Sequence, residues 1–188
     1  MTLDDWGARA EANVPWVRRA VWGVLLVALL AFVVRGADEP ADPYLVGSGQ
    51  RPLAGFGEAA FEIRTSEGRV LDWCALLAAT EAAREQGLMA QHDLRGYDGM
   101  LFRFDEPTTA EFYMFHTRIA LSIAFFDDTG TFVSATDMPV CTADEAGDCP
   151  VYPAARPYVH AVEVPKGGLG RLGIGPGSTM AITDGDCT

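Results

Sequence analysis

Residues 99–126 read GMLFRFDEPTTAEFYMFHTRIALSIAFF, and this stretch decides the fold class. It holds three short apolar and aromatic segments, GMLFRF, FYMFHT and ALSIAFF, which have the length and composition of β-strands. Polar residues separate the three segments. The stretch therefore predicts successive strands and not a regular alternation of strands and helices.

The same pattern continues on both sides. Before the stretch, FEIRT (61–65) alternates apolar and polar residues, a Glu-Gly turn follows, and residues 70–78 form a mostly apolar strand. After it, Asp128-Thr129-Gly130 predicts a tight turn into the strand TFVSATDM (131–138), which makes a hairpin. The last two predicted strands are YVHAVEV (158–164) and GSTMAIT (177–183).

A short helix is predicted between the second and third strands. Thr80 can cap its N-terminus, Glu81 is favourable in its first turn, and Gly87 suits the position after its last residue, Gln86. Many short strands, glycine and proline turns and one short helix indicate a mainly β chain. We therefore expect a compact, jelly-roll-like sandwich or barrel, and an N-terminal transmembrane helix before it.

The evidence for that helix is an uncharged apolar run, Ala20 to Val34, which lies between an arginine pair (18–19) and Arg35. As a helix the run would be roughly 22 Å long, and residues 16–17 bring it nearer to the ~30 Å of a hydrocarbon core. A cleaved signal peptide and an uncleaved signal anchor are both open, and the long acidic segment before the run favours the anchor. In either case the arginine pair marks the cytoplasmic side, so the rest of the chain is predicted to lie outside.

These features divide the chain into four parts. We expect a cytoplasmic segment (1–19), a transmembrane signal anchor (20–35), a flexible linker rich in Gly, Pro and acidic residues (36–58) and an extracytoplasmic β-rich domain (59–188). From Gly36 onward the chain has 23 acidic and 10 basic residues, a net charge of −13. Such a charge repels phosphate groups, so we expect no nucleic-acid partner.

All four cysteines lie in the exported part, where an even number indicates disulfide bonds. Cys141 and Cys149 flank a short loop rich in Asp, Glu and Gly and can meet locally, which leaves Cys74 to pair with Cys187. A metal or redox site is the alternative, but the chain lacks a Cys-x-x-Cys pair and zinc-ligand spacing. We therefore predict two structural bridges, 141–149 and 74–187.

Residues 168–173, GLGRLG, match the glycine pattern of dinucleotide-binding loops. That site needs a helix that begins at the last glycine, and the following IGPG breaks a helix. These glycines are predicted to be turn positions, and no cofactor is predicted.

Several ordered motifs resemble a known family. The segments AREQGLMAQHDLRGYDGMLFRF, FYMFHTRIALSIAFFDDTGTFV and CPVYPAARPYVHAVEVPKGGLGRLGI are similar to bacterial and archaeal domain-of-unknown-function family number 192, over residues 61–183. The resemblance implies a compact, mainly β, jelly-roll-like domain and no particular activity. The positions that match the family pattern are Gly87, Leu88, Met89, Gly99, Met100, Phe102, Phe112, Met114, Thr117, Leu121, Phe125, Asp127, Gly130, Glu163 and Gly167.

The chain also departs from that pattern. Tyr113 stands where the family usually has Trp, His116 where it has Asn, Ala120 where Pro is common and Ser122 where Asp is common. If the Asn and Asp serve a polar site in the family, the site of this chain is altered.

The leading hypothesis is a membrane-tethered binding or accessory domain without enzymatic activity, with an envelope glycan or protein as its partner. In a strand, FYMFHT would place Phe112, Met114 and His116 on one face and Tyr113, Phe115 and Thr117 on the other. One face would pack in the core and the other could bind the ligand. The residues assigned to a binding site are Tyr113, Phe115, His116, Thr117, Asp98, Asp127 and Glu163.

Two alternatives belong to other functional classes. A cell-envelope hydrolase or lyase could use paired carboxylates drawn from Asp98, Asp127, Asp137 and Glu163 as acid and base. A copper(I) site could use the thioethers of Met100 and Met114 with the imidazole of His116. The commoner role of such methionines is to fill gaps in a core.

Overall fold

The computed structural model describes residues 49–185 and residue 187. The predicted cytoplasmic segment, the predicted transmembrane helix (20–35) and the linker up to residue 48 lie outside these residues. In the described part of the chain, no helix combines the length and the apolar character needed to cross a bilayer.

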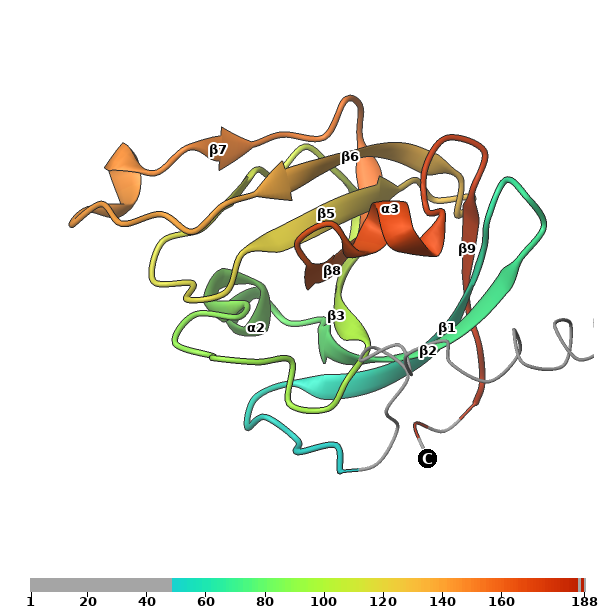
Figure 1. Ribbon diagram of the computed structural model, residues 1–188, viewed down its shortest axis with the longest axis horizontal. Helices are drawn as coiled ribbons and strands as arrows, with labels where there is room; N and C mark the ends of the chain where they lie inside the picture. Colours follow the sequence, from blue (N-terminus) through green and yellow to red (C-terminus); the bar gives the residue numbers. More distant parts are fainter. Residues whose placement is uncertain (1–48, 186, 188) are drawn as a thin grey trace, which may run out of the picture. The chain divides into compact units, whose positions relative to one another are not determined.

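The chain forms nine strands and three short helical segments within the described residues (Figure 1). The strands are β1 (Gly57–Arg64), β2 (Val70–Ala78), β3 (Gly99–Thr108), β4 (Phe112–Tyr113), β5 (Leu121–Phe126), β6 (Phe132–Met138), β7 (Val151–Tyr152), β8 (Tyr158–Pro165) and β9 (Thr179–Ile182). The helical segments are α2 (Glu81–Gln86), the 3₁₀ turn η1 (Ala146–Asp148) and α3 (Gly168–Leu172).

Seven strands form one mixed sheet in the order β6-β5-β8-β3-β2-β1-β9, and β4 and β7 form a second, two-stranded sheet. The pair β2–β3 is parallel, and the other pairs are antiparallel. The mainly β prediction is confirmed. Where a jelly-roll-like sandwich or barrel was expected, the described strands form a seven-stranded mixed sheet and a separate two-stranded sheet. Helix α2 connects β2 to β3, which lets these two strands run in the same direction.

The two edges of the large sheet meet at one point. Thr131, just before β6, forms a bridge with Thr179 in β9. The Phe132 N–H donates to the Ser178 carbonyl at 3.1 Å, and the Met180 N–H donates to the Gly130 carbonyl at 2.8 Å. Gly130 has a φ of 75°, and a Cβ atom there would lie 2.0 Å from the Met180 carbonyl oxygen, so the contact requires glycine. The sheet therefore curls until its edges touch.

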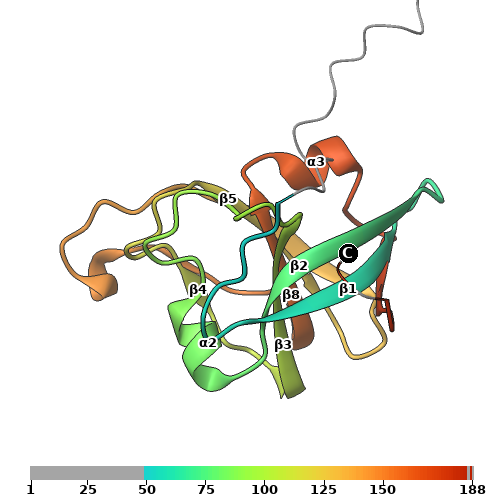
Figure 2. The same cartoon turned by 90° about the horizontal axis from the view of Figure 1, so that it is seen from below.

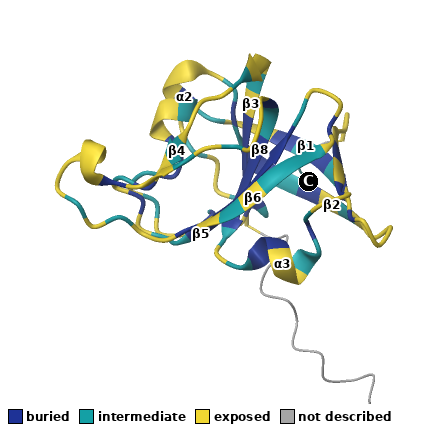
Figure 3. Ribbon diagram, turned by 90° about the horizontal axis from the view of Figure 1, so that it is seen from above, coloured by how far each residue is buried: buried dark blue, intermediate teal, exposed yellow. Residues whose placement is uncertain are grey.

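The large sheet carries an apolar core on each face. Figure 3 marks many residues of its central strands as buried. On β5, Ile123 and Phe125 face one core, and Ala124 and Phe126 face the other. All six residues of β5 are buried for this reason. A strand that is covered on both faces has a nearly continuous run of apolar residues, and residues 121–126 have such a sequence.

Helix α2 forms as the sequence predicts. The Thr80 side chain accepts a hydrogen bond from the Ala83 N–H at 3.2 Å, and Gly87 ends the helix with a φ of 47°. A second helix, α3, was not predicted. It occupies Gly168–Leu172, the segment assigned to turns, between left-handed glycines at 167 and 173. The prediction of one short helix is therefore corrected to two α-helices among the described residues.

The segment FYMFHT is not one continuous strand. Only Phe112 and Tyr113 pair in β4, after which the chain turns, with the Thr117 N–H donating to the Met114 carbonyl at 3.2 Å. His116 has a left-handed backbone with a φ of 57°. The predicted alternation of faces therefore ends at Tyr113. Asn, Asp and His adopt this conformation more readily than most residues, which gives a physical reason for the Asn or His at this position.

Both predicted disulfides are confirmed. Cys74 in β2 bonds to Cys187 across 113 positions, and Cys141 bonds to Cys149 across 8. At the other end of the domain, β1 begins at Gly57, two residues before the predicted domain boundary. Leu53 and Phe56, within the predicted linker, pack against the core.

Candidate functional site

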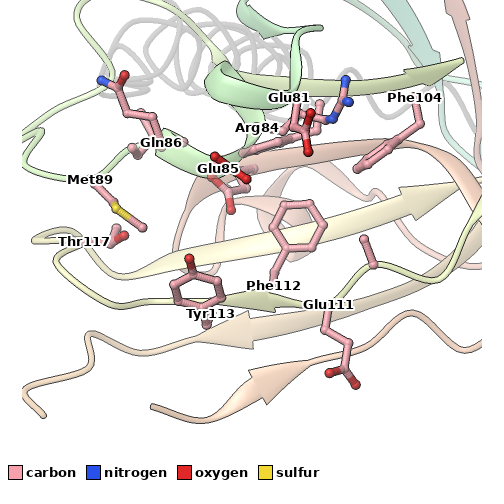
Figure 4. A pocket seen from close by; sticks show the side chains of 15 residues that line it. Glu81, Arg84, Glu85, Gln86, Met89, Phe104, Glu111, Phe112, Tyr113 and Thr117 are labelled. Carbon is pink, nitrogen blue, oxygen red and sulfur yellow. The ribbon is translucent and has the colours of Figure 1, made fainter. Parts of the chain in front are cut away.

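A cavity of about 350 Å³ lies between helix α2 and strand β4, which are neighbours in Figures 2 and 3. Figure 4 shows side chains of α2 on one side of it and Phe112 and Tyr113 on the other. Its volume is within the range of small-molecule sites. The lining residues are Glu81, Arg84, Glu85, Gln86, Gly87, Leu88, Met89, Phe102, Phe104, Ala110, Glu111, Phe112, Tyr113, Thr117 and Glu163.

Helix α2 is held over the sheet by its buried Ala83 and by Arg84. The Arg84 guanidinium donates to the carbonyls of Ala79 at 2.6 Å and Arg103 at 3.0 Å, and it lies 4.7 Å from the centre of the Phe104 ring. Two backbone contacts and one ring contact hold this cation in place. Arg84 therefore fixes one wall of the cavity.

The other wall is aromatic. The rings of Phe102 and Phe112 meet edge to face with their centres 4.9 Å apart, and Phe112 also contacts Phe125 at 5.7 Å. Tyr158 packs beneath, 5.4 Å from Phe104, and its hydroxyl donates to the Ala110 carbonyl at 2.8 Å. Such ring contacts restrict side-chain motion, so this wall is expected to be rigid.

Glu163 is the most unusual residue of the cavity. It lies in the middle of β8, between Met100 of β3 and Ile123 of β5, and only 5% of it is exposed. No residue in the described part of the chain donates a hydrogen bond to its carboxyl group, and burial raises its pKa to about 8. At neutral pH the group is therefore mostly protonated. A buried carboxyl without a protein partner, next to an open cavity, marks a candidate functional group.

A second cavity of about 370 Å³ adjoins the first, because Met89 and Thr117 line both. His116 and Arg118 line this second cavity, together with the segment 140–143. That segment contains Cys141, so the 141–149 disulfide supports the far wall.

The comparisons with known proteins agree with the mainly β domain. The profile of DUF192, described as "Uncharacterized ACR", matches residues 62–182. The chain belongs to the DUF192 family. No curated protein matches it.

Two solved structures are similar to this DUF192 chain. One is a protein of Sinorhizobium meliloti 1021 described as a candidate transcription regulator, with a TM-score of 0.61 and 25% identity over 70% of this chain and 98% of that one. The other is a protein of unknown function from Novosphingobium aromaticivorans DSM 12444, with a TM-score of 0.59 and 26% identity over 77% of this chain and 99% of that one.

The DUF192 domain brings some of the predicted site residues together. Tyr113, Thr117 and Glu163 line the first cavity, and Thr117 and His116 line the second. Phe115 stacks on the His116 ring with the ring centres 3.8 Å apart.

The aspartates predicted for the site make contacts elsewhere in the DUF192 domain, and none of the three lines either cavity. Asp98 accepts a hydrogen bond from the Cys74 N–H at 2.9 Å, and burial raises its pKa against the effect of that bond. Asp127 organises the β5–β6 turn and pairs with Arg156 at 2.8 Å. Burial would raise its pKa, but hydrogen bonds from Thr129 and Arg156 lower it to about 2. Asp137 accepts from the Ser122 hydroxyl.

The residues proposed as copper ligands lie in different environments of the DUF192 domain. Met100 and Met114 are buried in the core on the α2 side of the sheet, whereas His116 is exposed and stacks on Phe115. Within residues 49–185 and 187, no three His, Cys, Asp or Glu side chains gather in a way that could hold a metal ion.

Three glutamates that line the first cavity were not predicted from the sequence: Glu81, Glu85 and Glu111. Glu81 and Glu85 are four residues apart on α2 and therefore share a helix face. That spacing was visible in the sequence, but which face meets β4 depends on how α2 packs on the sheet.

Proposed function

We propose that this DUF192 domain is a membrane-tethered, extracytoplasmic binding or accessory domain whose α2–β4 cavity holds part of an envelope ligand, either a glycan or a protein segment. The observation that carries the proposal is the unpartnered carboxyl group of Glu163 beside an open, aromatic-walled cavity. Burial beside the cavity desolvates this carboxyl group, and a hydrogen-bonding ligand would recover part of that cost.

The proposed location rests on two other observations. Both cysteine pairs are bonded, and disulfides persist in oxidising compartments outside the cytoplasm. The apolar run Ala20 to Val34 supplies the proposed tether. We expect the domain to be found in the membrane fraction of lysed cells. In cells whose cytoplasmic membrane is intact, we expect protease added outside that membrane to digest it. Protection of the domain until that membrane is lysed would contradict the location.

The proposed ligand is not a nucleic acid. One similar structure is described as a candidate transcription regulator, but the formal net charge of this chain is −12. DNA-binding surfaces are positively charged because they neutralise phosphates. We therefore do not transfer transcription regulation to this chain.

Binding is tested by titrating the purified full chain with glycan fragments and envelope peptides while amide chemical shifts are recorded. We expect a ligand to shift the amides of Glu85, Tyr113 and Glu163. Ala110→Trp should abolish the shifts, because Ala110 is exposed and lines the cavity, so an indole there would fill it. Ala155→Trp is the matched control, since Ala155 is exposed and lines neither cavity. Shifts that persist unchanged in Ala110→Trp would contradict the proposal.

A hydrolase or lyase is the second candidate, because four glutamates line one cavity and burial has raised the pKa of one of them. A protonated carboxyl that faces an ionised one is the arrangement of acid–base pairs in glycoside hydrolysis. This candidate predicts release of reducing ends from envelope glycan, and loss of that release in Glu163→Gln. If a ligand shifts the cavity amides but no glycan product forms during a long incubation, the hydrolase or lyase candidate is rejected and the binding function stands.

A further inference from the structure

We infer that the α2–β4 cavity takes an organic cation, an alkyl chain that ends in an ammonium group, with Glu163 as its buried counter-charge. The inference rests on the proposed binding function and names the chemical class of the ligand. It follows from the charges, the aromatic walls and the unpartnered carboxyl group of the cavity.

The charged groups around the cavity are predominantly acidic. Glu81 and Glu85 extend from α2, and the exposed Glu111 precedes β4. Figure 4 shows Glu81 and Glu85 on the α2 side of the cavity. Among the described lining residues, Arg84 is the only cation. Its guanidinium is already bound to two backbone carbonyls and the Phe104 ring. The site therefore has negative charge that its own residues do not neutralise, which favours a cationic ligand over an anionic one.

The aromatic residues suit the same ligand. Phe102, Phe112 and Tyr113 line the cavity, and aromatic faces attract organic cations more strongly than they attract neutral molecules of the same shape. Phe104 already makes such a contact with Arg84 at 4.7 Å. Apolar rings would also cover the methylene groups of an alkyl chain.

Glu163 supplies the independent observation. It is 95% buried, it lines the cavity, and no residue in the described part of the chain pairs with it. A neighbouring cation would compensate the cost of its ionised form, so the carboxylate and the ammonium would stabilise each other away from water. An exposed acidic cluster alone would offer only a weak, screened attraction.

The ammonium group could come from two sources, a lysine side chain in an envelope peptide or a free diamine. Both have an unbranched alkyl chain that fits a cavity of about 350 Å³. Both sources present the same ammonium group on an alkyl chain, and different probes are needed to distinguish them.

The experiment compares pentan-1-amine with pentan-1-ol, which differ in charge at nearly equal length. The full chain is titrated with each at pH 7.5, and amide shifts locate the binding. We expect the amine to bind at least tenfold more tightly than the alcohol, with shifts at Glu85, Tyr113 and Glu163. The chain is then titrated with Nα-acetyl-lysine N-methylamide, which represents a peptide lysine, and with pentane-1,5-diamine, which represents a free diamine. The probe that binds more tightly identifies the source of the ammonium group.

Three variants make the test specific. Glu163→Gln should weaken the amine at least tenfold and change the alcohol less than twofold. Glu85→Gln should weaken the amine by a smaller factor, about threefold, and provides a second test if Glu163→Gln folds poorly. Glu106→Gln removes the same charge from an exposed residue that lines neither cavity and should leave both affinities unchanged.

The possible failures are distinguishable. If the alcohol binds as tightly as the amine and both shift the cavity amides, the cation inference is wrong and the binding function stands. An amine preference that survives in both Glu163→Gln and Glu85→Gln would also overturn the inference. If no probe, glycan or peptide shifts the cavity amides, both proposals fail.

Discussion

Glu163 makes the stability of the domain depend on pH. Its carboxyl group has an ordinary pKa near 4.5, which burial raises to about 8. Between these two values the folded chain keeps the proton that the unfolded chain loses. The free energy of unfolding therefore falls as the pH rises through this window, and it levels off above pH 8. The titratable groups around the same cavity are Glu81, Arg84, Glu85, Glu111 and Tyr113.

Glu163→Gln should remove this pH dependence, because glutamine stays neutral at every pH. At about 1.4 kcal/mol per pKa unit, the upper limit of the gain above pH 8 is ~5 kcal/mol, and water in the open cavity reduces it. Urea unfolding of both proteins at pH 4.5, 6.5 and 8.5 measures the effect. We expect the variant to match the native chain at pH 4.5 and to exceed it increasingly at the higher values. Parallel curves for the two proteins would show that Glu163 ionises freely in the folded state.

The sequence identified Glu163 as one carboxylate among four, and only the fold could separate them. Asp98 and Asp127 look equally suitable in the sequence, but backbone N–H groups hold both of them. Whether a carboxylate caps a turn or faces a cavity depends on partners that are distant in the chain. Glu85 was missed for the same reason, since an exposed glutamate on a short helix has no distinctive local pattern.

Among the strands and helices, prediction succeeded where the spacing of apolar residues along the chain matched the side chains that the fold buries. The strands β1, β2, β3, β5, β6, β8 and β9 all occur where apolar alternation or a mostly apolar run predicted them. The strand prediction failed at FYMFHT because Met114, although buried, lies in a turn and not in a strand. Prediction failed again at α3 because a five-residue helix that contains two glycines has no amphipathic period to detect.

The β5–β6 turn gives a prediction at the scale of elements. Gly130→Ala should destabilise the domain by about 2–4 kcal/mol, because alanine is strained at a φ of 75° and its Cβ would clash with the Met180 carbonyl 2.0 Å away. The loss should appear as an earlier midpoint in urea unfolding. Gly147→Ala is the control, since a Cβ there meets nothing within 4 Å, and it should shift the midpoint little. Equal midpoints for the two variants would mean that the contact between the sheet edges contributes little.

At the scale of the molecule, the two disulfides differ mainly in the length of chain they enclose. The chain-entropy relation gives ~5 kcal/mol for the 74–187 bridge, which spans 113 positions, and roughly half of that for the 141–149 bridge, which spans 8. We expect Cys74→Ala/Cys187→Ala to lower the thermal midpoint more than Cys141→Ala/Cys149→Ala does. The reverse order would indicate that the short bridge stabilises the cavity wall through its contacts and not through entropy.

The pairing of β1 with β9 has a consequence for the proposed export of the domain. A chain leaves the ribosome from its N-terminus, so β1 emerges long before the strand that completes its sheet edge and before Cys187, the partner of Cys74. Contacts between such distant segments form slowly. We therefore expect an incomplete chain to stay unfolded during synthesis, as a secretion channel that admits only extended polypeptide requires. With the proposed extracytoplasmic location, folding would finish on the far side of the membrane, where the cysteines can also be oxidised.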